Sequence, residues 1–238
     1  MLAGDTDLSF PGETRFVVEN GEIVPLHRLH LPTGTILTAV NDDGLFVGYF
    51  GAEGPGHSLS EFVTYSRGRV TVLSDLITRY VGRVPTNLSL LRLGENGDMI
   101  FNGNIGTPDQ LATTYLLRDG VLTEYAATVL TDVNRQGELV GYDAAEYPFV
   151  GRGFRILPTG QRLDLPEGLA PTRINDRGAI FGYIGQTDYY GGDQVAVFQD
   201  GELSILNADI PVPQGATLVG WSVIDVDELG RALLRQTY

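Results

Sequence analysis

Three histidines, His27, His30 and His57, are the side chains of this sequence best suited to metal binding or proton transfer. Three neutral imidazoles can hold Zn²⁺ with one position left for water, and one imidazole can serve as a general base near neutral pH. His-x-x-His spacing in a connection is a weak signal, and three ordinary polar residues are the simpler interpretation. We therefore name the three as candidate catalytic and metal-binding residues while expecting no metal or other cofactor.

Two aspartates, Asp132 and Asp225, form a second candidate for catalysis. Both stand five residues before a turn glycine of an internal repeat, where the other copies have Ala39, Arg92 and Arg173. A glycosidase needs two carboxyl groups, one as acid and one as base or nucleophile. Opposite charges at this repeated position favour structural ion pairs instead, because an unpaired buried charge is costly.

Aromatic residues in the connections between repeats form the third candidate site. Flat rings with polar edges suit the apolar faces of sugars, and neighbouring carboxylates can accept hydrogen bonds from hydroxyl groups. The alternative is that these rings fold back over the sheet edges. The expected ligand-binding residues are Tyr80, Tyr147, Asp188, Tyr189, Tyr190, Asp193 and Trp221.

Composition limits the classes of partner. All 16 basic residues are arginine, and 30 acidic residues give a formal net charge of −14, which disfavours nucleic acid and anionic membranes. The absence of cysteine excludes disulfides and thiol catalysis. No apolar run is long enough to span a membrane. The start lacks the features of a signal peptide, so we expect either a cytoplasmic protein beginning at Met1 or an exported one already processed.

A phrase built around a turn glycine recurs along the chain, as in "DVNRQGELVGYD" at 132–143 and "RINDRGAIFGYI" at 173–184. Alternating apolar residues flank a turn rich in Asn, Asp and Gly, which predicts a β-hairpin. We call this the first phrase. Its five turn glycines are Gly44, Gly97, Gly137, Gly178 and Gly230.

A second phrase, as in "VAVFQDGELSIL" at 195–206, alternates with the first and also predicts a hairpin. Its glycines are Gly21, Gly68, Gly120, Gly160 and Gly201. Four of them follow a first-phrase glycine by 23 or 24 residues, which indicates one rigid unit of two hairpins. Four strands in about 40–53 residues is the size of a propeller blade.

The repeats predict an all-β, five-bladed β-propeller forming a single domain over residues 1–238. The sequence starts with a second-phrase hairpin and ends with a first-phrase hairpin, so the fifth blade is expected to combine the two and remove open sheet edges. An open β-solenoid and a pair of β-sandwiches are the alternatives. The expected blades are 35–73, 88–125, 127–165, 171–206, and 217–236 together with 14–26.

The pairing of "xINxxGxxxGY" with a following "aFxxxxGxxxxL", clearest at 173–206, resembles the HAF-type repeats of predicted bacterial extracellular proteins. The resemblance covers essentially the whole chain but involves turn and core positions only. It implies an exported protein of propeller type and transfers no catalytic residue. The histidine that names those repeats is absent before Val195, Phe154 and Tyr115.

If both kinds of turn lie at one end of the strands, the variable connections lie at the other end, where binding groups usually occur. The expected function is therefore a monomeric, ligand-binding propeller that presents a site for a glycan or small polar molecule. The alternative is a small propeller enzyme, such as a hydrolase, lyase, isomerase or cyclase, with one asymmetric pocket.

Overall fold

A computed structural model shows how the chain folds. It describes residues 2–4, 16–19, 22–32, 34–41, 43–52, 59–66, 68–82, 86–104, 113–144, 152–184, 194–207, 210–211, 214–215 and 220–237. The chain divides into two compact units, one made of residues 1–109 with 115–123 and the other of residues 110–114 with 124–238. We describe each unit by itself.

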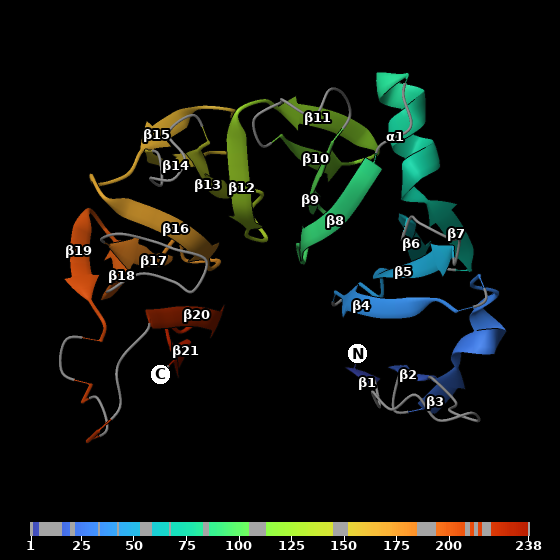
Figure 1. Cartoon of the computed structure of the whole chain (residues 1–238), viewed down its shortest axis with the longest axis horizontal. Helices are drawn as coiled ribbons and strands as arrows, with labels where there is room; N and C mark the ends of the chain where they lie inside the picture. The colour runs from blue at the N-terminus through green and yellow to red at the C-terminus, as the bar shows by residue number, and fades with distance from the viewer. Residues whose placement is uncertain are drawn as a thin grey trace. The chain divides into compact units, whose positions relative to one another are not determined.

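The first unit is built on antiparallel sheets (Figure 1). One sheet has the order β4-β5-β6-β7, and a second, whose last strands reach the unit boundary, has the order β11-β10-β9-β8. Their strands are β4 (Ile36–Val40), β5 (Phe46–Ala52), β6 (Leu59–Ser66), β7 (Arg69–Val72), β8 (Thr86–Leu93), β9 (Met99–Asn104), β10 (Thr114–Arg118) and β11 (Val121–Tyr125). A third sheet joins β1 (Leu2–Gly4), β2 (Phe16–Glu19) and β3 (Glu22–Pro25), and a short 3-10 helix, η1 (Leu26–Leu29), follows it.

The second unit repeats the same plan. Two four-stranded sheets have the orders β12-β13-β14-β15 and β16-β17-β18-β19, and β20 and β21 form a separate two-stranded sheet. The strands are β12 (Thr128–Val133), β13 (Leu139–Asp143), β14 (Gly153–Ile156), β15 (Arg162–Asp164), β16 (Leu169–Ile174), β17 (Ile180–Ile184), β18 (Gln194–Gln199), β19 (Glu202–Ile205), β20 (Gly220–Val226) and β21 (Ala232–Thr237).

The predicted hairpins are confirmed among the described residues. Each first-phrase glycine lies in the turn of an antiparallel pair and has a positive φ, between 76° and 84°. Four second-phrase glycines, from Gly68 to Gly201, also have a positive φ, whereas Gly21 lies outside the described residues. Four sheets thus correspond to the four continuous blades that the sequence predicts.

Each end of the chain forms a sheet within its own unit, and the expected pairing of the two ends in a fifth sheet stays a prediction. The C-terminal hairpin is the two-stranded sheet β20-β21 of the second unit, and the N-terminal hairpin β2–β3 belongs to the three-stranded sheet of the first. The edge of β2 opposite β3 is paired with β1, with Leu2 opposite Val18 and Gly4 opposite Phe16. The structure therefore shows an all-β fold of repeated antiparallel sheets, and a closed propeller remains a proposal.

Three of the five first-phrase hairpins have a glycine four residues after the turn glycine, where the backbone of the paired strand lies very close. A Cβ added at Gly48, Gly141 or Gly182 would lie 2.5, 2.2 or 2.1 Å from a backbone carbonyl oxygen of the paired strand. Real side chains do not tolerate such distances, so only glycine fits. The register also shifts just before the position of Asp132 in every copy, which is the mark of a β-bulge.

Buried asparagines at the start of first-phrase turns join neighbouring hairpins. In Asn175, Oδ1 accepts a hydrogen bond from the backbone N–H of Ala179 at 2.9 Å, while Nδ2 donates to the carbonyl of Asp227 in the next hairpin at 3.1 Å. Asn134 does the same with Glu138 N–H at 2.9 Å and the carbonyl of Asn175 at 3.1 Å. One side chain thus closes its own turn and fixes the next hairpin.

The first unit contains the same contact. Asn41 accepts from Leu45 N–H at 2.9 Å and donates to the carbonyl of Gly94 at 3.4 Å. The three asparagines are only 2–3% exposed. Two hairpins cannot repeat the donation, because Gly94 has no side chain and the carboxylate of Asp227 has no N–H. The boundary between the compact units falls in the chain after the hairpin that contains Gly94.

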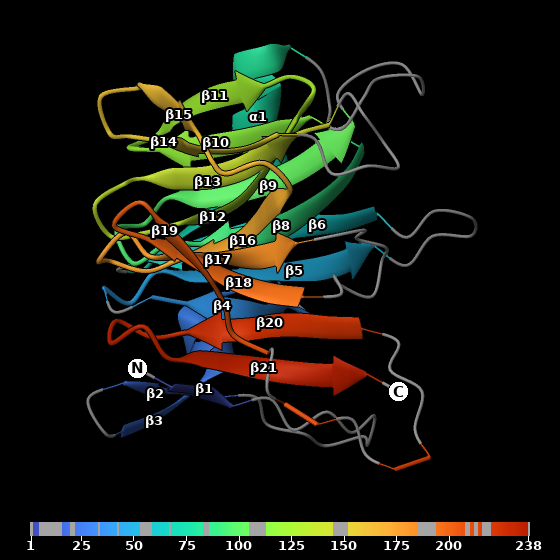
Figure 2. The same cartoon turned by 90° about the vertical axis from the view of Figure 1, so that its left-hand side faces the viewer.

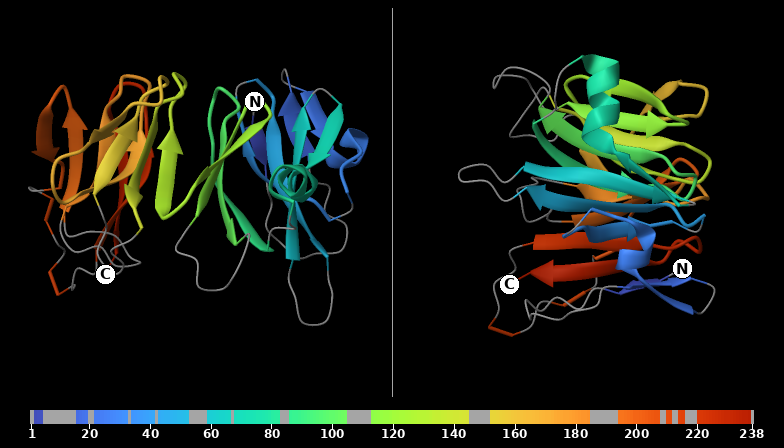
Figure 3. Two further views of the ribbon diagram at one scale, coloured as in Figure 1. Left: turned by 90° about the horizontal axis from the view of Figure 1, so that it is seen from above. Right: turned by 90° about the vertical axis from the view of Figure 1, so that its right-hand side faces the viewer.

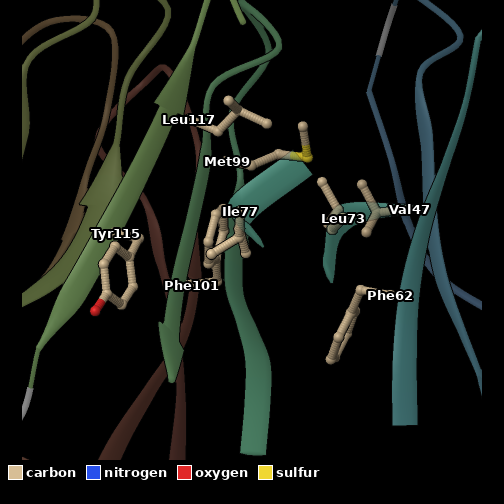
Figure 4. Close-up of a cluster of buried hydrophobic side chains, with 8 residues drawn as sticks. All are labelled: Val47, Phe62, Leu73, Ile77, Met99, Phe101, Tyr115 and Leu117. Carbon is tan, nitrogen blue, oxygen red and sulfur yellow. The ribbon is translucent and has the colours of Figure 1, made fainter. Parts of the chain in front are cut away.

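One α-helix occurs in the described part of the chain, α1 (Leu73–Val81), where the sequence predicted only a connection. It packs against β6 and β7 (Figure 3). Leu73 and Ile77 are 2% and 0% exposed and belong to the hydrophobic core drawn in Figure 4, with Val47, Phe62, Met99, Phe101, Tyr115 and Leu117. Gly82 caps the C-terminal end of the helix. It adopts the left-handed conformation, with φ at 70°, and its N–H donates a hydrogen bond to the carbonyl oxygen of Thr78. It is far too short to span a membrane, and no described helix is long and apolar enough to do so.

We expect Asn175→Ala to destabilise the protein by about 3 kcal/mol, because it removes the hydrogen bonds of this side chain to Arg177, Ala179 and Asp227 and leaves buried backbone groups unsatisfied. Asn96→Ala is the matched control, since Asn96 is exposed and bonds only within its own turn, to Asp98. It should cost about 1 kcal/mol or less. Urea unfolding curves measure both, and equal losses would contradict the proposed role of Asn175.

Candidate functional site

Most of the predicted ligand-binding residues lie in connections outside the described residues. These are Tyr147, Asp188, Tyr189, Tyr190 and Asp193, together with the candidate metal ligand His57. The strands that lead into the two connections are placed: β13 and β14 flank the first, and β17 and β18 flank the second. Both connections leave the sheets at the end opposite the hairpin turns.

The remaining histidines lie around η1. His27 is within this helix, and His30 follows it as the C-cap residue, with φ at 54° and ψ at 30°. His30 is exposed. Among the described residues, no group of three or more His, Asp or Glu side chains could hold a metal ion. Convergence of the three histidines stays a prediction, because it depends on His57.

Two predicted ligand-binding aromatics are placed differently from the expectation. Trp221 lies at the start of β20 and not in a connection, and at 4% exposure it packs in a core cluster with Phe181 and Val223. Its indole therefore has no face open to a ligand. Tyr80 is 53% exposed on α1, but its hydroxyl donates to the carbonyl of Gly120 in a hairpin turn. It ties the helix to the turn end of the second sheet.

The two candidate catalytic aspartates have unlike surroundings. Asp132 is 3% exposed, and its Oδ2 accepts a hydrogen bond from the backbone N–H of Ile174 in the next sheet at 2.9 Å. Asp225 is exposed, and its Oδ1 accepts from the N–H of Val226. Arg173 donates to the carbonyl of Ile224 at 3.3 Å, again in the next hairpin. These contacts support a structural role for the repeated position.

Tyrosine recurs five residues after three first-phrase glycines, at Tyr49, Tyr142 and Tyr183, and Tyr183 joins two hairpins. The hydroxyl oxygen of Tyr183 accepts a hydrogen bond from the N–H of Val223 at 3.0 Å. Burial raises the pKa of Tyr142, so its phenol stays neutral. The hydrogen bond of Tyr183 and the burial of Tyr142 support a structural role for these two side chains.

Turn ends carry acidic residues that are already paired. The 3% exposed carboxylate of Asp98 lies 2.6 Å from Arg118 Nη2, and the carboxylate of Glu138 lies 2.5 Å from Arg155 Nη2. Backbone groups of successive turns are bonded as well: Arg135 N–H donates to Asp176 at 2.7 Å. These polar groups of the described turns are therefore already engaged within the scaffold.

Sequence reasoning missed a charged cluster on the sheet β12-β13-β14-β15. Arg162 on β15 donates from Nη1 and Nη2 to the two carboxylate oxygens of Asp143, at 2.9 and 2.7 Å. Its guanidinium carbon lies 4.1 Å from the ring centroid of Phe154, in a cation–π contact. Asp143 ends β13, at the foot of the connection that contains Tyr147. The ion pair between Asp143 and Arg162 depends on the register of the strands, so no local sequence pattern predicts it.

The hydrogen bonds from Arg162 hold the pKa of Asp143 below its ordinary value, and the charge of Arg152 adds to the effect. The same contact raises the pKa of Arg162. Asp143 is therefore a carboxylate that is already neutralised by a guanidinium. It can accept hydrogen bonds from a ligand, but it is a poor general acid or base near neutral pH.

Comparison with models of known protein families finds no match, and comparison with curated proteins finds no significant relative. The resemblance to HAF-type repeats remains an expectation based on the turn and core residues quoted above.

We expect Asp143→Asn to be less stable than the parent at pH 7 and the difference to narrow as the pH falls below about 4. A carboxyl group whose pKa is lowered by folding stabilises the folded state at pH values above its pKa in the unfolded chain. This contribution is lost as the pH falls through the folded-state pKa and the carboxylate becomes protonated. Melting temperatures from pH 7 to pH 2.5 test this. Asp164→Asn is the control, because Asp164 is 59% exposed and 3.6 Å from Arg162. If the melting temperatures of Asp143→Asn and the parent differ by the same amount at every pH, the Asp143 carboxylate does not cause the pH dependence.

His30→Gly should stabilise the protein by about 1 kcal/mol, since glycine adopts the left-handed conformation after a helix without strain. Denaturant unfolding gives the change. If His30 were a metal ligand, the variant would instead lose a Zn²⁺-dependent rise in melting temperature shown by the parent.

Proposed function

We propose that this protein is a ligand-binding module whose sheets form a five-bladed propeller, with a site for a glycan or other small polar molecule on the connections between hairpins. The observation that carries the proposal is the difference between the two ends of the sheets. Side chains and backbone groups at the turn end are bonded from one hairpin to the next. The connections at the other end differ in length and sequence from sheet to sheet.

Several features support the propeller arrangement. Four sheets have the same strand order, strand number and bulge position. The asparagine contact links consecutive hairpins in a constant direction along the chain. β20–β21 is a first-phrase hairpin with no second-phrase hairpin in its sheet, and β2–β3 is a second-phrase hairpin whose sheet contains β1 but no first-phrase hairpin.

The composition of the connections supports a polar, uncharged ligand. The segment 185–193 reads "GQTDYYGGD", which combines two rings with amide and carboxylate acceptors. Tyrosine provides contact area and a hydroxyl group at little conformational cost. The net charge of −14 disfavours anionic ligands unless a positive patch offsets it.

A thermal-shift screen over neutral sugars, acidic sugars and small polyols tests the function. For a compound that binds, replacement of Tyr189 and Tyr190 by alanine should weaken binding roughly tenfold or more with little change in melting temperature. Tyr80→Ala is the matched control: it removes a tyrosine tied to a hairpin turn, so it should lower the melting temperature and leave the affinity unchanged.

Two results would count against the proposal. If no compound shifts the melting temperature, or if the double alanine variant binds as well as the parent, the connections do not form the site. If a bound sugar derivative is converted during the assay, the protein is an enzyme.

A further inference from the structure

The turn between β8 and β9 contains an asparagine followed directly by a glycine. Asn96 is exposed, and Gly97 adopts a left-handed conformation with φ at 84°. Because glycine has no Cβ, the backbone nitrogen of Gly97 is sterically open. This nitrogen can attack the side-chain amide of Asn96 and release ammonia. The turn therefore contains the residues needed for deamidation without an enzyme.

One other asparagine in the described part of the chain precedes a glycine, and its backbone is held by a sheet. Asn102 and Gly103 lie inside β9, with Asn102 opposite Ser89 of β8. β9 has β8 on one side and β10 on the other (Figure 2). The strand would have to leave both neighbours before the nitrogen of Gly103 could react. In the turn, the N–H of Gly97 has only to leave the carbonyl of Gly94, at 3.0 Å.

The side chain of Asn96 is bonded to the residue after the glycine. Its Oδ1 accepts a hydrogen bond from the backbone N–H of Asp98 at 3.1 Å, and its Nδ2 donates to Asp98 Oδ2 at 2.8 Å. Attack on the amide carbon places negative charge on Oδ1, the atom to which the Asp98 N–H already donates. A donor fixed at the atom that becomes charged favours the reaction.

Three N–H groups converge on one buried carboxylate oxygen beside Asn96. Asp98 is 2% exposed, and its Oδ2 accepts hydrogen bonds from Asn96 Nδ2 and from Nε and Nη2 of Arg118, the last two at 2.9 and 2.6 Å. Deamidation would remove the amide donor and bring a second carboxylate to the same arginine. Two carboxylates at hydrogen-bond distance repel each other, so the product is less compatible with this turn than the amide.

We propose that Asn96 is a site of spontaneous deamidation, and that the modification loosens a contact between two sheets of the first unit. A bond forms between the Gly97 nitrogen and Cγ of Asn96, the Cγ–Nδ2 bond breaks, and ammonia leaves with the proton of the Gly97 N–H. Water then opens the succinimide ring and gives aspartate or isoaspartate at this position. Water is the one co-reactant that the reaction consumes.

The contact that the modification weakens is the one made by Asn41. Its Nδ2 lies 3.4 Å from the carbonyl oxygen of Gly94 and 3.3 Å from that of Glu95, the two residues that precede Asn96. The turn that carries these carbonyls must shift when aspartate is repelled by Asp98, or when isoaspartate adds a methylene to the main chain. A change at an exposed residue thus acts on the junction between the sheets β4-β5-β6-β7 and β11-β10-β9-β8.

Incubation of the folded protein at mildly alkaline pH, followed by peptide mass spectrometry, tests the reaction. Cleavage after arginine gives one peptide, residues 93–118, that contains both asparagines followed by glycine. Fragment ions should show an acid in place of the amide at Asn96, formed at least roughly tenfold faster than at Asn102, which reacts only after the sheet opens. Equal rates at the two positions, or an unchanged Asn96 after weeks, would overturn the proposal.

Asn96→Asp imitates one product and tests its consequence. Its melting temperature should fall by roughly 6 °C, and that of Asn96→Ala by about 3 °C or less, because alanine brings no charge to Asp98. Asn96→Asp combined with Asp98→Asn is the matched control: it again places one amide and one carboxylate beside Arg118 and should recover much of the loss. Equal melting temperatures for Asn96→Asp and Asn96→Ala, or no recovery in the double variant, would contradict the inference. These measurements involve no ligand, so the inference and the proposed function fail separately.

Discussion

The arrangement of the hairpins depends on one buried amide group. An asparagine amide has an acceptor and a donor at opposite ends, and both must be bonded when the side chain is buried. In Asn134 and Asn175 the acceptor closes the local turn, and the donor reaches a carbonyl of the next hairpin. The side chain is therefore satisfied only when the neighbouring hairpin is in place. This couples turn formation to the spacing of the sheets.

The same requirement accounts for residues that look catalytic in the sequence. Asp132 is buried at the strand nearest the turn, and it bonds to the backbone of the next sheet, as does Arg173. The Asp132 carboxylate accepts a hydrogen bond from the buried backbone N–H of Ile174, so its role is structural. Charged residues at a repeated position are thus part of the scaffold, and the chemistry must be sought where the repeat ends.

The hairpins could be predicted because their signals are local. Turn glycines, Asn and Asp residues and alternating apolar residues all lie within about twelve positions of one another. The helix α1 was missed although Leu73, Leu76, Ile77 and Tyr80 have helical spacing and Gly82 ends the run, because the segment was assigned to a connection from its place between phrases. Trp221 was misplaced for the same reason. The Asp143–Arg162 pair depends on register across three strands, which no local pattern fixes.

The pairing of Asp143 with Arg162 also bears on where specificity can arise. Both oxygens of the carboxylate are engaged, and the guanidinium lies on the ring of a fully buried phenylalanine, so the strand end is charge-balanced and fixed. Asp143 N–H further donates to the carbonyl of Arg152, which closes the base of the connection. A base held in this way lets the connection change in sequence without disturbing the sheet. In the proposed binding role, selectivity is therefore expected to come from the connections themselves, and the net charge of −14 favours neutral polar molecules over anions.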